Sequence, residues 1–157
     1  MIMDERNEFA DAVSVAAAAG TILVGDVIDS GEVVRNLGSG QPVYLNITVD
    51  TEVITGGVAG TIEFQLVSDA AAAIATDGSA TVHYSSGELV TGAAGANADS
   101  LNAGATIVSV PLPAQDTYER YFGILAVIGT TTTTAGAINA FLSLDPIGWK
   151  AYPEGNN

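Results

Sequence analysis

The stretch AGAINAFLSLDPIGWKAYPEG, residues 135–155, decides how the chain ends its fold. Two sets of side chains alternate along it, Ile138, Ala140, Leu142 and Leu144 on one face and Asn139, Phe141 and Ser143 on the other. This period of two predicts a half-buried β-strand with Phe141 on its outer face. Asp145-Pro146 ends the strand, because proline has no N–H for the ladder. An irregular tail follows, and it carries the only tryptophan, Trp149, with Lys150 and Tyr152.

The same alternation predicts strands in most of the chain. They are expected over residues 12–18, 21–28, 43–49, 61–67, 80–84, 89–90 and 106–112. The clearest of them points Val43, Leu45, Ile47 and Val49 inward and Asn46 and Thr48 outward. Residues 121–128, YFGILAVI, are apolar on both faces, so we expect a central strand that is covered on both sides.

Some segments between these strands also carry local signals. Gly25 lies inside a predicted strand, which indicates a bulge or a close backbone approach. Residues 70–75 form at most one helical turn, and residues 130–134, five threonines, are expected to be a solvent-facing loop. Pro111 and Pro113 indicate an edge or a strand end for the strand at 106–112.

Eight or nine short strands without a long helix predict an all-β protein. Since so many strands do not fit one half-exposed sheet, we expect a two-layer antiparallel β-sandwich, specifically a jelly roll, with extended N- and C-terminal segments. The expected division is an N-terminal arm over residues 1–11, a jelly-roll domain over 12–145 and a C-terminal tail over 146–157. At 157 residues, one domain is enough to bury a real core.

The charge of the chain argues against several kinds of partner. With 18 acidic and 4 basic residues, the net charge is −14. A chain of this sign repels phosphate, so we expect no nucleic-acid partner. It also repels its own copies, except through neutral, apolar patches or where ions screen the charge. No apolar run reaches the length of a membrane span, and the acidic start lacks the features of a secretory signal. We therefore expect a protein made in the cytoplasm that leaves it only by assembly or lysis.

The sequence offers little for catalysis. There is no cysteine and one histidine, His83, which the alternation places on an exposed strand face opposite Val82. A serine nucleophile needs an activating base, and zinc would have only carboxylates as further ligands. The acidic pairs Asp26 with Asp29 and Asp50 with Glu52 are the nearest approach to a glycosidase carboxylate pair, and they lie on strand ends and turns. We expect no enzymatic activity and no cofactor.

A metal site is not predicted either. Calcium prefers clustered carboxylates and loop carbonyls, and the acidic turn at residues 26–32, DVIDSGE, is the nearest candidate. Its spacing departs from that of a calcium-binding loop.

The candidate contact residues are aromatic or lie beside aromatics. They are Phe9, Phe141, Trp149, Lys150 and Tyr152. Aromatic side chains are enriched where proteins meet. Two interpretations stay open: the tail docks on another chain, or it folds back and covers its own sandwich.

Several of these segments together resemble a known family. They are the acidic start with Phe9, Val27-Ile-Asp-Ser-Gly31, residues 38–45 (GSGQPVYL), residues 64–69 (FQLVSD), Leu112-Pro113 before Glu119-Arg-Tyr121, and above all residues 141–146 (FLSLDP) with residues 149–153 (WKAYP). The chain resembles the capsid cement proteins of tailed bacteriophages, of the Bordetella-phage type. The similarity runs over nearly the whole chain, and the closing motif is its most specific part.

The resemblance implies a jelly-roll protein on the outer surface of the virion capsid. Such a protein binds the major capsid protein, clamps neighbouring subunits after the shell expands, and forms a homo-oligomer, a trimer or a dimer. The family provides no catalytic residue to carry over. The alternative function is a carbohydrate- or receptor-binding β-sandwich module of a virion fibre, which requires a groove with exposed aromatic rings.

Overall fold

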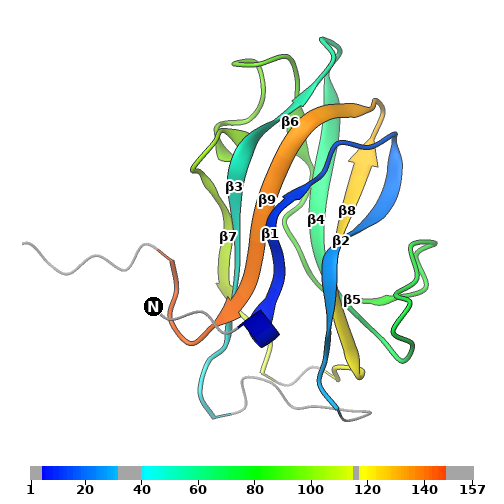
Figure 1. Cartoon of the computed structure of the whole chain (residues 1–157), viewed down its shortest axis with the longest axis vertical. Coiled ribbons are helices and arrows are strands. Elements are labelled where there is room, and N and C mark those ends of the chain that lie inside the picture. Colours follow the sequence, from blue (N-terminus) through cyan, green and yellow to red (C-terminus); the bar gives the residue numbers. More distant parts are fainter. Residues whose placement is uncertain (1–4, 32–39, 115–116, 148–157) are drawn as a thin grey trace, which may run out of the picture.

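A computed structural model describes residues 5–31, 40–114 and 117–147 of the chain (Figure 1). In these ranges nine strands form two antiparallel sheets that pack face to face. Two short 3-10 turns, η1 (Glu5–Asn7) and η2 (Asp99–Leu101), are the helical elements of the described part. None of the helices described there is long and apolar enough to cross a membrane.

The strand order confirms the jelly roll. The first sheet contains, in spatial order, β1 (Glu8–Ser14), β9 (Thr133–Ser143), β3 (Tyr44–Thr55) and β7 (Thr106–Pro111). The second contains β2 (Gly20–Asp29), β8 (Tyr121–Gly129), β4 (Gly60–Asp69) and β5 (Thr81–Ser85), with β6 (Leu89–Thr91) also paired to β4. Because β9 lies between β1 and β3, and β8 between β2 and β4, the chain crosses repeatedly from one sheet to the other.

The core lies between the two sheets and follows the predicted alternation. Leu45, Ile47 and Val49 of β3 are fully or almost fully buried, as are Ile62 and Phe64 of β4. These side chains face each other because successive residues of a strand point to opposite faces. The inward rows therefore form one continuous apolar layer.

The second sheet is covered on its outer face as well, over part of its area. Residues 70–80 cross that face and bring Ile74 onto Val67 and Leu125. The Asp69 carboxylate accepts hydrogen bonds from the backbone N–H groups of Ala71 and Ala75, and these bonds lower its pKa. The two-sided burial predicted for the strand at 121–128 is confirmed, whereas residues 70–75 form bends and not a helical turn.

Several strand boundaries differ from expectation. β1 begins at Glu8 and not at residue 12, so part of the predicted arm pairs with β9. β9 begins at Thr133, so the threonine run is not wholly a solvent-facing loop: Thr133 is buried, and its hydroxyl donates to the carbonyl of Val15. The edge position predicted for the proline-containing strand is confirmed by β7.

Gly25 shows both features that were expected of it. The pairing of β2 with β8 shifts register between Val24 and Ile28, and Gly25 has a φ of +70°. A Cβ atom placed there would lie 1.9 Å from the carbonyl oxygen of Phe9, in the backbone of β1. Glycine is therefore required where β1 and β2 meet.

We predict that Gly25→Ala lowers the free energy of unfolding by about 3 kcal/mol, because backbone atoms cannot give way as a side chain can. The matched control is Gly87→Ala, whose φ is +71° but whose added Cβ would meet nothing within 4 Å. This control is expected to cost only about 1 kcal/mol, the penalty of the left-handed conformation. Equal losses in urea denaturation would contradict the close approach.

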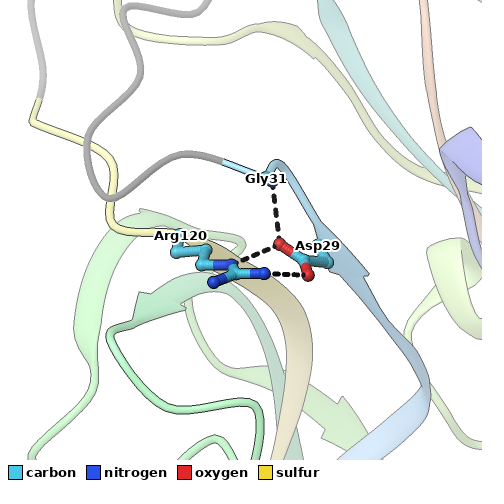
Figure 2. Close-up of polar contacts among 3 residues, drawn as sticks. All are labelled: Asp29, Gly31 and Arg120. Carbon is cyan, nitrogen blue, oxygen red and sulfur yellow. Dashed lines mark hydrogen bonds and ion pairs between the residues drawn. The ribbon is translucent and has the colours of Figure 1, made fainter.

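An ion pair ties the end of β2 to the start of β8 (Figure 2). The Nε and Nη2 atoms of Arg120 each donate to one carboxylate oxygen of Asp29, both at 2.7 Å. The backbone N–H of Gly31 donates to the same carboxylate, which closes the predicted turn. The Arg120 hydrogen bonds, followed by that of Gly31, lower the pKa of Asp29 from 3.8 to about 2.

This pair predicts a defined response to acid. A carboxyl group whose pKa is lower in the folded chain than in the unfolded chain stabilises the folded state at any pH above its unfolded pKa. This contribution is lost as the pH falls towards the folded pKa of about 2. Asp29→Asn should therefore lower the thermal midpoint at neutral pH, and its difference from the wild type should shrink steadily below pH 3.8 and be mostly lost at pH 2. Asp26→Asn, which removes the same charge from the same strand, is the control. A difference that stays constant with pH would exclude the ion pair as its source.

Candidate functional site

Phe141 lies on the outer face of the first sheet, as the alternation predicts, but it is not exposed. It pairs with Glu8 of β1 and Asn46 of β3, and only 6% of it is accessible to solvent. The expectation of a free aromatic contact at Phe141 is therefore wrong. The reason is that the outer face of this sheet is covered where β9 ends.

Three polar side chains on adjacent strands bind the chain after β9. They are Asn46 on β3, Ser109 on β7 and Ser143 on β9, and together with the backbone of Asp145 and Ile147 they form what we call the C-terminal clasp. Figure 1 shows the segment after β9 turning towards the β7 side of the sheet.

The hydrogen bonds of the clasp form one chain of donors and acceptors that begins at the N–H of Ile147 and ends at the carbonyl of Asp145. The N–H of Ile147 donates to Ser109 Oγ at 3.0 Å and Ser109 Oγ donates to Asn46 Oδ1 at 2.8 Å. Asn46 Nδ2 then donates to Ser143 Oγ at 2.7 Å, and Ser143 Oγ donates to the carbonyl of Asp145. Each hydroxyl both accepts and donates, which lets neighbouring bonds polarise one another.

The clasp explains the burial of Asn46, which was expected to face solvent. Its side chain does point outward from the core, but the segment at Asp145–Ile147 crosses over it and leaves it 0% exposed. Buried amide atoms need hydrogen-bond partners. Asn46 Oδ1 accepts from Ser109 and Ile147, and Asn46 Nδ2 donates to Ser143. The interpretation in which the tail folds back on its own sandwich thus holds through Ile147. Trp149, Lys150 and Tyr152 lie outside the described residues.

Phe9 must also be removed from the set of candidate contact residues. It belongs to β1 and is 1% exposed, inside the core between the sheets. The sequence suggested otherwise because Phe9 stands in a charged segment that was taken for an arm. Pairing of β1 with β9 brings it inward.

His83 is half-buried and not on an open strand face. Its Nε2 lies 2.7 Å from Ser68 Oγ, and its ring stacks on Tyr118 with 4.2 Å between centroids. The register of β4 with β5 shifts between Leu66 and Val67, so His83 occupies a bulge, and it is Val82 that is exposed. Ser68 is 0% exposed and accepts a second hydrogen bond from the N–H of Glu119. A substrate cannot reach this hydroxyl in the folded chain.

Asp29, Asp50 and Glu52, three members of the acidic pairs, accept hydrogen bonds from other groups of the chain. Asp29 is held by Arg120, which lowers its pKa, whereas a general acid needs a raised pKa. The Glu52 carboxylate accepts a hydrogen bond from the N–H of Gly95, and that of Asp50 accepts one from Thr51. In the described ranges, no cluster of three or more acidic or histidine side chains has the arrangement of a metal site.

The clasp gives a direct prediction. Asn46→Ala removes the central link, so that Ser109 loses its acceptor and Ser143 its donor, which should lower the free energy of unfolding by about 1–3 kcal/mol. It should also speed proteolytic removal of the C-terminal segment. Thr48→Ala, on the same face of β3, is the control and should change neither strongly. Unchanged proteolysis of the Asn46 variant would show that the clasp does not hold the segment.

Comparisons with known proteins agree with the phage resemblance. No curated protein matches the chain. A family model described as Bbp16 matches residues 9–142, which extend from the first strand of the jelly roll into the last. The match covers most of the chain and nearly all of the sandwich. The chain therefore belongs to the Bbp16 family, a Bordetella phage protein family.

Proposed function

We propose that this protein is a capsid cement protein, a structural component of the virion. In this proposal it binds the outer surface of a phage head and clamps neighbouring major capsid subunits, so that the shell resists internal pressure. Membership in a phage family supports the virion setting. The proposal involves no catalytic step and no cofactor.

The C-terminal clasp is the observation that carries the proposal. A clamp must pass force from the segment that grips its partner into a rigid body. The clasp bonds the chain at Asp145 and Ile147 to side chains from β3, β7 and β9, three neighbouring strands. A pull on the residues after Ile147 is thereby shared across three strands of the first sheet and does not act on β9 alone.

The sequence after the clasp suits a segment that binds another protein. Residues 148–157 contain Trp149 and Tyr152, of types that are frequent at the centres of protein interfaces, with Lys150 beside Trp149. The net charge of −14 also suits a protein displayed in many copies on a particle, because it keeps particles apart.

The alternative, a carbohydrate-binding fibre module, finds less support. Stacking on sugar rings needs exposed aromatic side chains, and all the aromatic side chains described in residues 5–31, 40–114 and 117–147 are buried or half-buried. The large hydrophobic side chains that are exposed in these ranges are aliphatic, namely Val58, Val82, Val90 and Leu144.

We predict that full-length protein sediments with expanded heads that lack it and raises the temperature at which those heads release DNA. Trp149→Ala combined with Tyr152→Ala should lose both effects while its own thermal midpoint changes little. Glu154→Gln, in the same segment, is the matched control and should bind as the wild type does.

Two results would contradict the proposal. Heads without the protein could prove as resistant to heat as complete heads, which would remove the clamp. The double variant could instead fail to fold, which would place Trp149 and Tyr152 in the protein's own core and not at its contact with the shell.

A further inference from the structure

One end of the sandwich is formed by four loops that contain no charged residue. The loops join β1 to β2 (residues 15–19), β3 to β4 (56–59), β6 to η2 (92–98) and β8 to β9 (130–132), and none contains Asp, Glu, Lys, Arg or His. Figure 1 shows them at the upper end of the molecule, away from the described chain ends. We call these four loops the neutral end.

Contacts between the loops and the strand ends beneath them make the neutral end one continuous surface. The N–H of Thr133 donates to the carbonyl of Ala17, and the N–H of Thr55 donates to the carbonyl of Gly92. The hydroxyl of Thr134 reaches the carbonyl of Ile54. A Cβ atom at Gly60 would lie 2.7 Å from a methyl group of Thr131, so the β3–β4 and β8–β9 connections also touch.

The exposed residues of two loops of the neutral end are glycine or apolar. Residues 56–59 and 93–96 are all exposed and consist of glycine, alanine and Val58. Val58 is 65% exposed, the highest value among the exposed large hydrophobic side chains of the described residues. Two carboxylates lie at the flank of this end. Glu52, on β3, is half-buried and accepts a hydrogen bond from Gly95, and Asp99, at the start of η2, is exposed.

The opposite end has the reverse character. Six acidic residues and one arginine lie there, at strand ends or in connections. They are Glu8, Asp29, Asp69, Asp77, Glu119, Asp145 and Arg120. In a chain with a net charge of −14, two copies that met through this end would bring acidic groups together. A basic partner would be attracted to the acidic end. An identical copy meets the least repulsion at the neutral end.

We propose that the neutral end is the surface through which copies of this chain bind one another in a closed cyclic oligomer. Burial of Val58 and the alanine methyl groups provides the attraction, and the absence of charged side chains removes the main obstacle. This proposal does not rest on the cement function, because it is argued from the distribution of charge and the exposed apolar side chains of this chain. It also leaves the C-terminal clasp free at the other end.

The test is the mass of the full-length protein at micromolar concentration and physiological salt, measured by sedimentation velocity and light scattering. The wild type should be an oligomer. Val58→Glu places a carboxylate on every copy at the contact and should yield monomers, with partial recovery of the oligomer in high salt. Val90→Glu, at a valine on β6 that is 54% exposed, is the matched control and should keep the wild-type mass.

Circular dichroism establishes that each variant is folded. If Val58→Glu does not fold, Ala94→Glu in the neighbouring loop decides the question by the same criterion. The proposal is overturned if the wild type is monomeric, if the folded neutral-end variant keeps the oligomer mass, or if Val90→Glu alone dissociates it. The last result would move the interface to the outer face of the second sheet. Head binding is measured separately, so failure here does not decide the cement function.

Discussion

The pairing of β9 on both of its edges is the constraint on which the rest of the structure depends. It binds β1 on one side and β3 on the other, and so joins the start, middle and end of the chain in one sheet. Its inner face supplies Ile138 and Ala140 to the core. Its outer face carries Phe141, and its last residue, Ser143, belongs to the C-terminal clasp. One strand therefore fixes the core, the N-terminal strand and the departure point of the tail.

The fold was predictable because its strongest determinant is local. Alternation of apolar and polar side chains at residues 43–49 and 61–67 marks the rows that face the core, and those rows are buried as expected. The continuous apolar run of β8 marks a strand covered on both faces, and residues 70–80 provide the second cover. The role of Gly25 was predictable too, because a glycine inside a strand usually marks a bulge or a close approach of another backbone.

The candidate site was less predictable because it depends on contacts between distant residues. Asn46 and Ser143 are 97 positions apart, and Ser109 and Asn46 are 63 apart. Alternation placed Asn46 and Phe141 on the outer face correctly, but nothing local indicates that a later segment will cover that face. His83 was misplaced for a related reason, because one extra residue in a bulge reverses the side-chain parity that follows.

The jelly-roll topology itself separates the two proposed contacts. The chain crosses between the sheets at both ends of the sandwich. The four loops of the neutral end lie at one end, and the other connections lie with the described chain ends at the opposite end. Along β3 the clasp residue Asn46 and the neutral-end residue Thr55 are separated by about 30 Å of extended strand. A protein that gripped a shell and its own copies with one surface would face competition between the two. Here the uncharged loops and the C-terminal clasp lie at opposite ends of the sandwich, so the two proposed contacts do not compete for one surface.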